Sequence, residues 1–469
     1  MLLDGYPLHT LDLELSLAGD AYKSSLTRSG TQYSYYKDDA HNISRIHPLG
    51  GPVAGGSTLT LYPTDDRLLV DLGGASTGLR CRFQYWHLPA PGESLERVTT
   101  TVGATLTDCS AARACGGGRR AFSCSTPPYT GPLVDGAGDV TVEVSLNGQD
   151  FSESGTVFSF YDSSWWRVRS FSPHGGPLGG NTSVTIETAN LRALGDARCR
   201  FGVWNTETNA TVTSPELVRC ATPPHWNSRT GTQREVLELT LNGQDYLKSA
   251  VFTYYAVDDS AKGLSVLHVA PNGGPAAGGT LVEVSGTGFL KMGGMLCRFG
   301  DADSTAVPAT RSSARSLRCL TPPTVISGGA GLHERSVDVA LNGQAPGWTS
   351  SAVTFTYYEP SHISVSFATP RGAPRDTSIP ITVSGSGFQD FNHGKGLFCK
   401  FDALPLVPAS VGENGAQNVR CQSPTPTASE TEFVQCPATT QPLGGGLSRI
   451  EVVVNGAQVV GGAANFKFF

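Results

Sequence analysis

The sequence has no apolar run of about 18 residues and only three methionines among its 469 residues. The first absence excludes a membrane-spanning helix from this segment, and the scarcity of long amphipathic stretches argues against a helix-rich protein. Basic clusters are also missing, because the 34 basic and 40 acidic residues are dispersed along the chain. We therefore expect neither a nucleic acid nor an anionic membrane as a partner, since both attract concentrated positive charge.

What the chain has in abundance is glycine and proline, with 56 and 30 residues. They fall at regular intervals between strand-like runs, which is typical of the tight turns of an all-β protein. The length predicts several domains of ordinary size.

An opening phrase occurs four times. Its copies are PLGGPVAGGSTLTL (48–61), PHGGPLGGNTSVTI (173–186), PNGGPAAGGTLVEVSGTGF (271–289) and PRGAPRDTSIPITVSGSGF (370–388). The phrase reads as a Pro/Gly-rich turn that leads into a strand, in which Val282 and Val284 alternate with Glu283 and Ser285. A phrase that recurs in this way indicates an array of repeats.

A closing phrase ends each repeat. Its copies are VTVEVSLNGQDF (140–151), EVLELTLNGQDY (235–246), SVDVALNGQ (336–344) and RIEVVVNGAQ (449–458), each followed by an aromatic-rich strand. Asparagine and glycine both tolerate positive φ and together give a strong hairpin signal. We predict that the last two strands of every repeat form a hairpin.

The spacing of these phrases predicts a partial repeat at residues 1–42. Four full repeats follow, here numbered one to four, at 43–162, 163–262, 263–360 and 361–469. We expect six or seven short strands in each. The short links between the repeats favour an extended rod over freely tumbling domains.

The first residues match a closing phrase, with LDLELSLAGDAYKSS (11–25) before TQYSYY (31–36). A lone hairpin cannot bury its apolar face, so we predict a fragment of a longer array or an artificial start. The beginning of the chain also lacks the basic and apolar regions of a signal peptide. Taken alone, that absence predicts a cytoplasmic protein, but it carries little weight if the chain begins inside a repeat.

Two further cysteine-containing phrases lie between the opening and closing ones. A Cys-Arg-Phe or Cys-Lys-Phe strand begins at Cys81, Cys199, Cys297 and Cys399, and Cys124, Cys220, Cys319 and Cys421 each precede a Thr-Pro or Ser-Pro turn. An insertion in repeat one widens the spacing of its pair to 43 residues, against 21 or 22 in the others.

Together these phrases resemble the IPT/TIG repeat, an immunoglobulin-like β-sandwich of plexins, fibrocystin-like ciliary membrane proteins and some transcription factors. The matching elements are the P-x-G-G-P-x-x-G-G opening with S-G-T-G-F, the C-R-F-G strand, the C-x-T-P-P turn and the L-N-G-Q hairpin. Repeat four departs from the pattern, with Gly-Ala-Pro in place of Gly-Gly-Pro and no T-P-P turn. The resemblance implies tandem all-β sandwiches closest to the cell-surface, disulfide-bearing kind, but it does not imply an activity.

The equivalent cysteines allow two interpretations. They form one disulfide per repeat (Cys81–Cys124, Cys199–Cys220, Cys297–Cys319 and Cys399–Cys421), or they are buried free thiols, as in the cytosol or the interior of a cilium. Repetition of the pair favours disulfides, each contributing about 3 kcal/mol. Cys109 and Cys115 can pair locally across a glycine-rich loop. Cys436 is left over from eleven cysteines and is a free thiol or a link to another chain.

Three glycosylation acceptors occur at Asn42, Asn181 and Asn209. We expect each of them in a link, a strand entry or a loop. They fit a secreted glycoprotein, although such triplets also arise by chance in a chain rich in serine and threonine.

No catalytic or metal-binding constellation emerges. Gly74–Gly78 matches the G-x-S-x-G pattern, but no helix follows it, so we attribute the match to chance. Asp135–Asp139 lacks the acid spacing of a calcium loop, and no cysteine or histidine cluster has zinc spacing. Trp165 and Trp166 are either a packing pair or an exposed contact surface. We predict no enzyme, no cofactor and no metal.

The sequence therefore predicts a noncatalytic structural or adhesion-type protein, part of a filamentous array at the cell surface or outside the cell, including a ciliary surface coat. Protein partners or self-assembly would use sandwich edges and loops. One alternative is an intracellular filamin-like scaffold such as a ciliary axoneme component, with reduced cysteines and unmodified acceptors. Another is an accessory carbohydrate-binding module of a larger enzyme. A DNA-binding role is disfavoured because no basic loop set is present.

Overall fold

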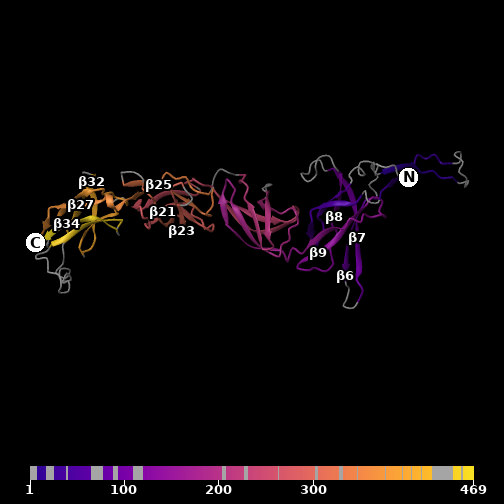
Figure 1. Ribbon diagram of the computed structural model, residues 1–469, viewed down its shortest axis with the longest axis horizontal. Helices are drawn as coiled ribbons and strands as arrows, with labels where there is room; N and C mark the ends of the chain where they lie inside the picture. The colour runs from indigo at the N-terminus through magenta and orange to yellow at the C-terminus, as the bar shows by residue number, and fades with distance from the viewer. Residues whose placement is uncertain are drawn as a thin grey trace. The chain divides into compact units, whose positions relative to one another are not determined.

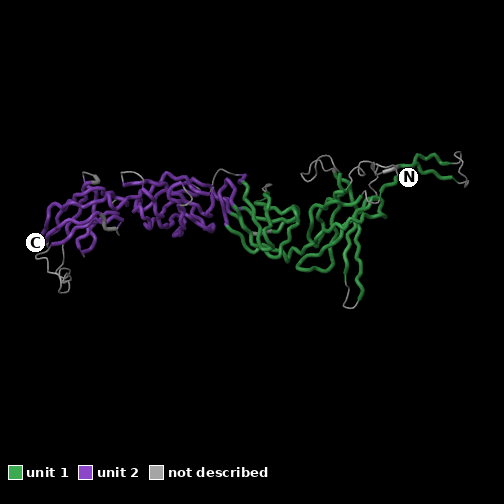
Figure 2. Tube along the Cα trace, viewed as in Figure 1, with its two compact units in different colours: residues 1–172, 183–223, 235–252 green, residues 173–182, 224–234, 253–469 purple. Residues whose placement is uncertain are grey.

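The structure is a computed structural model in which nearly all regular structure is β-strand (Figure 1). It describes residues 8–16, 26–37, 41–64, 78–87, 93–108, 120–202, 207–226, 231–261, 263–301, 305–326, 331–345, 347–374, 377–392, 395–402, 404–412, 415–424, 447–455 and 458–469. The chain divides into two compact units (Figure 2). Unit 1 holds residues 1–172, 183–223 and 235–252, and unit 2 holds residues 173–182, 224–234 and 253–469.

Four eight-stranded sheets follow one another along the chain. In repeat one the strands are β3 (Ile43–His47), β4 (Gly50–Pro52), β5 (Thr58–Pro63), β6 (Arg80–His87), β7 (Glu96–Asp108), β8 (Arg120–Ser125), β9 (Ala137–Ser145) and β10 (Thr156–Tyr161). In repeat two they are β11 (Arg167–Ser172), β12 (Gly175–Pro177), β13 (Ser183–Ala189), β14 (Arg198–Phe201), β15 (Glu207–Ser214), β16 (Leu217–Ala221), β17 (Thr232–Thr240) and β18 (Tyr246–Tyr255).

In repeat three the strands are β19 (Ser265–Ala270), β20 (Gly273–Pro275), β21 (Leu281–Thr287), β22 (Leu296–Phe299), β23 (Ala306–Ser313), β24 (Ser316–Leu320), β25 (Leu332–Ala340) and β26 (Thr354–Tyr358). A 3-10 turn, η4 (Pro360–His362), precedes the first strand of repeat four. Its strands are β27 (Ser364–Thr369), β28 (Gly372–Ala373), β29 (Pro380–Ser386), β30 (Leu397–Phe401), β31 (Val407–Gly412), β32 (Gly415–Gln422), β33 (Leu447–Val454) and β34 (Gln458–Phe468).

The order of the strands is the same in all four sheets. Repeat one reads β3-β5-β8-β7-β6-β9-β10-β4, and the other repeats place their equivalent strands identically. Strand β7 makes this arrangement a sandwich, because it pairs with β6 as far as Gly103 and with β8 from Ala104 onward. The two layers enclose a core that includes Leu59, Phe122 and Phe158. The predicted fold class of tandem all-β sandwiches is therefore confirmed.

The opening phrase was expected to be a turn, and that expectation is wrong for its Gly-Gly-Pro part. These residues form a short strand that pairs in parallel with the last strand of the same repeat, as Gly50 does with Ser159. A Cβ atom at Gly50 would collide with the carbonyl oxygen of Ser159, so glycine permits the close pairing. This strand also raises the number per repeat to eight, above the predicted six or seven.

The closing hairpins are confirmed, as in the antiparallel pairs β9–β10 and β33–β34. Asparagine tolerates positive φ, but among the four asparagines of these turns only Asn455 adopts it, at 57°. In the other three repeats the side chain makes the turn. The Asn147 Oδ1, for example, accepts hydrogen bonds from the backbone N–H groups of Gln149 and Asp150, both at 2.9 Å. Asparagine therefore shapes these turns through its side chain.

The hairpin expected near the N-terminus is also present. Strands β1 (Leu8–Asp12) and β2 (Gln32–Tyr36) pair in antiparallel fashion, with Leu8 opposite Tyr36. Tyr36 packs against the core of repeat one, whereas Leu11, Tyr33 and Tyr35 of the same hairpin are exposed.

Candidate functional site

Among the described residues, one disulfide joins the fourth and sixth strands of each repeat. The pairs are Cys81–Cys124, Cys199–Cys220, Cys297–Cys319 and Cys399–Cys421, with Cα–Cα distances of 6.5, 6.3, 6.4 and 6.3 Å. In repeat one the fifth strand places Val102 opposite Cys81 and Ala104 opposite Cys124. Because that strand passes from one layer to the other, the disulfide joins the two layers through the core.

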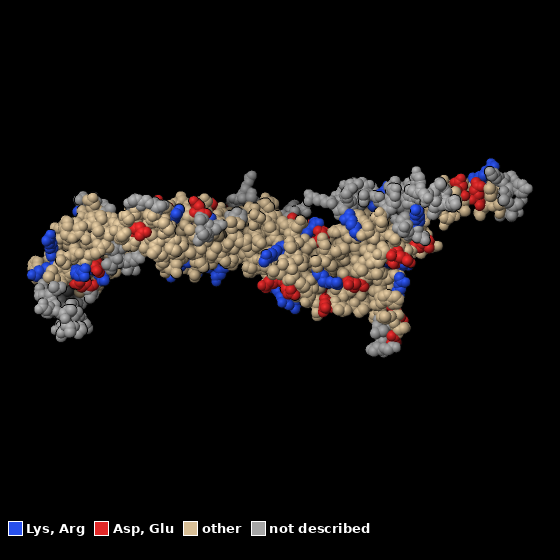
Figure 3. All heavy atoms as spheres, viewed as in Figure 1, with Lys and Arg blue, Asp and Glu red and all other residues tan. Residues whose placement is uncertain are grey.

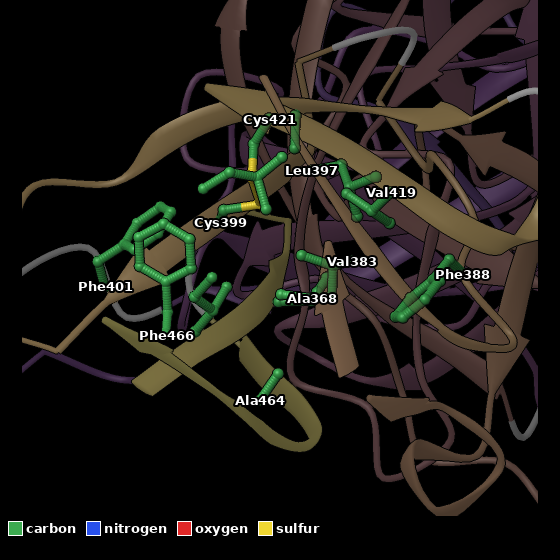
Figure 4. Close-up of a cluster of buried hydrophobic side chains, with 14 of the residues drawn as sticks. Ala368, Val383, Phe388, Leu397, Cys399, Phe401, Val419, Cys421, Ala464 and Phe466 are labelled. Carbon is green, nitrogen blue, oxygen red and sulfur yellow. A yellow bond between two sulfur atoms is a disulfide. The ribbon is translucent and has the colours of Figure 1, made fainter. Parts of the chain in front are cut away.

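A phenylalanine two residues after the first cysteine lies on the same face of the strand. In repeat four, Figure 4 shows Phe401 and Phe466 side by side near the Cys399–Cys421 bond. Their ring centroids are 5.7 Å apart in an edge-to-face arrangement. The Phe201–Phe252 and Phe299–Phe355 pairs repeat this geometry at 5.4 and 5.5 Å. The aromatic pair and the disulfide therefore form one core unit in these repeats.

A cross-strand ion pair lies next to the first cysteine of every repeat. The basic residue of the Cys-Arg-Phe or Cys-Lys-Phe strand stands directly opposite an acid of the closing strand. The pairs are Arg82–Glu143, Arg200–Glu238, Arg298–Asp338 and Lys400–Glu451. Sequence reasoning missed these contacts. The signal was available, since a basic and an acidic residue recur at matched positions of two phrases in every copy.

In the first three repeats an aromatic ring covers the arginine. The guanidinium carbon lies 4.0, 3.5 and 4.6 Å from the ring centroids of Phe151, Tyr246 and Trp348. Each ring follows the Asn-Gly turn of the closing phrase. Burial together with Glu207 raises the pKa of Tyr246 to about 12, with burial the larger cause. The arginine is thus held between an acid and an aromatic face.

The predicted glycosylation acceptors occupy different environments. Asn181 is exposed and has a φ of 61°, in the turn before β13. Asn42 is half-buried and its Oδ1 accepts a hydrogen bond from the backbone N–H of Glu153 at 3.3 Å. Asn209 is exposed but lies within β15, so the expectation that it stands outside a strand is wrong. Its side chain points to solvent because that face of β15 lies outside the core.

Trp165 and Trp166 were expected to be either a packing pair or an exposed contact surface, and the structure shows a different environment for each. Trp166 is fully buried and stacks on Tyr161, with ring centroids 4.3 Å apart. Trp165 is half-exposed and its ring lies over Gly136, where a Cβ atom would collide with it. Packing therefore accounts for Trp166, while Trp165 has one free face.

Other candidates can be placed only in part. Cys109, Cys115 and Cys436, and residues 74–77 of the G-x-S-x-G match, lie outside the described residues. Asp139 accepts hydrogen bonds from Ser159 at 2.5 Å and from Arg192 at 3.1 Å. That carboxylate therefore takes part in packing between neighbouring repeats.

The described surface carries both signs of charge. On the face shown in Figure 3, basic and acidic side chains are interspersed rather than gathered into single-sign fields. Among the described residues, no helix is long and apolar enough to cross a membrane. Nor do three or more potential metal-ligating side chains come together in that part of the chain.

Repeated immunoglobulin-like sandwiches, each with a disulfide between its layers, define a class of tandem β-sandwich proteins. Residues 167–254 and 264–357 match the family model of the IPT/TIG domain. Repeats two and three therefore match the IPT/TIG family, which the sequence phrases resemble.

The chain is similar to human Plexin-A3, at 25% identity over 266 residues, which cover 56% of this chain and 12% of that protein. It is also similar to human Fibrocystin-L, at 22% identity over 267 residues, or 57% of this chain and 6% of that protein. The chain therefore spans only a small part of these relatives. Among solved structures, the full extracellular region of plexin A4 aligns with 96% of this chain and 39% of its own, at 14% identity and a TM-score of 0.34.

Proposed function

We propose that this chain is a noncatalytic structural or adhesion-type segment of an extracellular or cell-surface array. The observation that carries the proposal is the disulfide inside each of the four sandwiches. Such bonds persist in oxidising compartments and are rare in the cytosol. Similarity to Plexin-A3 and Fibrocystin-L supports the same placement.

The domain arrangement is part of the proposal. We place the partial repeat at residues 1–42 and the full repeats at 43–162, 163–262, 263–360 and 361–469. Protein contacts would use the sandwich edges and loops, where unpaired backbone groups are accessible.

Mass spectrometry of the unreduced native protein tests the placement. We expect peptides that join Cys199 to Cys220 and Cys297 to Cys319, together with glycan mass on the exposed Asn181 and Asn209. An Asn209→Gln variant should lose only its own glycan. Free thiols and unmodified asparagines would instead favour an intracellular scaffold. The same data would assign Cys109, Cys115 and Cys436.

Cross-linking mass spectrometry tests the contact surfaces. Cross-links from partner proteins or second copies should fall on edge strands and exposed loops. Cross-links confined to the sandwich ends would contradict lateral contact and favour a spacer that binds nothing along its length.

A further inference from the structure

The opening phrase of repeat one contacts the Asn-Gly turn of repeat two within unit 1. The Asn242 Nδ2 donates a hydrogen bond to the carbonyl oxygen of Gly50 at 3.2 Å. The Leu49 backbone N–H donates to the carbonyl oxygen of Leu194 at 3.2 Å. A polar side chain of one repeat therefore forms a hydrogen bond with the main chain of the repeat before it.

Gln244 and Asp245 of the same turn extend this contact. The Gln244 side chain accepts a hydrogen bond from the Thr58 N–H and donates one to the Thr58 carbonyl oxygen, both at 2.8 Å. The Ser57 hydroxyl donates to the Asp245 carboxylate at 2.7 Å. Three of the four residues of the Asn-Gly-Gln-Asp turn thus bind the opening phrase.

The same contact occurs twice in unit 2. The Asn342 Nδ2 donates to the carbonyl oxygen of Gly175 at 3.3 Å, and the His174 N–H donates to that of Met292 at 2.9 Å. The Asn455 Nδ2 donates to the carbonyl oxygen of Gly273 at 2.7 Å. An equivalent backbone bond, at 2.7 Å, runs from Asn272 to Phe391. Three junctions therefore share one pattern.

The glycine at each junction leaves room for the neighbouring repeat. A Cβ atom at Gly50 would come within 2.9 Å of the Leu194 side chain. At Gly175 it would come within 2.5 Å of the Met292 sulfur, and at Gly273 it would collide with the Phe391 ring. Glycine at this position thus serves the neighbouring repeat in addition to the strand pairing in its own.

Repeat one supplies an internal comparison. Its turn, Leu146–Asp150, has the same Leu-Asn-Gly-Gln-Asp sequence as Leu241–Asp245, and both asparagines accept the same pair of backbone hydrogen bonds. Both also donate to the aspartate three residues on, at 2.7 and 2.8 Å. Asn147 is exposed, however, whereas Asn242 is 1% exposed. The turn forms in both places, so the bonds to Gly50 and Thr58 are additional.

We propose that the Asn-Gly turns of repeats two, three and four are recognition sites for the Gly-Gly-Pro strand of the repeat before each of them. The carboxamide binds a glycine carbonyl oxygen, and a backbone carbonyl of the later repeat binds the N–H of the residue before that glycine. We call this pair of hydrogen bonds the latch. It joins two consecutive repeats, with the Asn-Gly turn always supplied by the later repeat and the Gly-Gly-Pro strand by the earlier one. The inference goes beyond the proposed function, because it holds in any compartment.

Hydrogen–deuterium exchange of the full chain tests the latch through the amides of residues 48–58. Asn242→Asp keeps the Oδ1 atom that shapes the turn but removes the donor to Gly50. Exchange in this segment should rise about fivefold, the equivalent of about 1 kcal/mol for one hydrogen bond. Asn147→Asp makes the same chemical change in an identical but exposed turn, and should leave the segment unchanged.

A second pair of variants keeps the test decisive if Asn242→Asp does not fold. Gln244→Ala removes both bonds to Thr58 and should accelerate exchange in residues 48–58, whereas Gln149→Ala should not. Unchanged exchange in the repeat-two variants would overturn the latch. So would an equal rise in the repeat-one controls, because the effect would then come from the turn alone.

Discussion

Asp338 shows how one carboxylate organises the cross-strand pair of repeat three. It is 4% exposed and accepts hydrogen bonds from Arg298 at 3.3 Å, the Thr349 hydroxyl at 3.2 Å and the Ser351 N–H at 3.1 Å. Asp338→Ala would leave the Arg298 charge without its carboxylate partner. We expect the free energy of unfolding to fall by about 3 kcal/mol.

Chemical denaturation followed by circular dichroism measures that loss. Asp301→Ala is the matched control, since Asp301 is exposed in the same repeat, and it should change stability by less than about 0.5 kcal/mol. Equal effects of the two substitutions would show that the cross-strand pair contributes nothing.

Tyr358 provides a test in the alkaline range. Burial raises its pKa to about 12, from 10.0, and its ring stacks on Phe391 with centroids 5.0 Å apart. Between pH 10 and pH 12 the folded chain keeps a proton that the unfolded chain loses. Stability therefore declines as the pH rises through this window.

Denaturant titrations at several pH values measure this decline. Tyr358→Phe should reduce its slope, while Tyr33→Phe, at an exposed position, should not. An unaltered slope in Tyr358→Phe would contradict the assignment.

The short opening strand depends on glycine at one position and not at another nearby. A Cβ atom at Gly175 would collide with the carbonyl oxygen of Thr253, whereas at Gly179 it would meet nothing within 4 Å. Gly175→Ala should therefore cost about 1–3 kcal/mol of stability, and Gly179→Ala should be near neutral. Thermal unfolding of the two variants distinguishes them, and equal melting temperatures would contradict the packing argument.

Strands in which apolar and polar residues alternate could be predicted from the sequence, and strands without that alternation could not. Val282 and Val284 are buried between exposed Glu283 and Ser285, as their alternation indicates. The Gly-Gly-Pro strand has three residues and no period, so only its parallel pairing defines it. The Arg298–Asp338 pair depends on strand register, which no single phrase contains. Repetition made the cysteine pairs visible, because equivalent positions recur in every copy.

At the scale of the whole molecule, the same three kinds of interaction recur along the chain. A disulfide joins the layers of each sandwich, an ion pair ties the fourth strand to the closing strand, and an asparagine links one repeat to the next. Repetition of the cysteine pairs in the sequence favoured the disulfides over free thiols. The ion pairs and the asparagine contacts were missed, because each joins phrases that are distant along the chain. An array built in this way repeats its contacts as well as its fold.

Reduction of the disulfides tests how far each sandwich depends on its own covalent link. The loops that the disulfides close span 43, 21, 22 and 22 residues. In the chain-entropy account, loops of this size contribute about 3–4 kcal/mol each by restricting the unfolded chain. For a domain of roughly 100 residues, such a loss lowers the melting temperature by at least about 10 °C. Calorimetry with and without a phosphine reductant measures the shift, and Cys199→Ala/Cys220→Ala should reproduce it for repeat two alone. Identical transitions in both conditions would mean that the buried aromatic pairs stabilise the sandwiches without help from the disulfides.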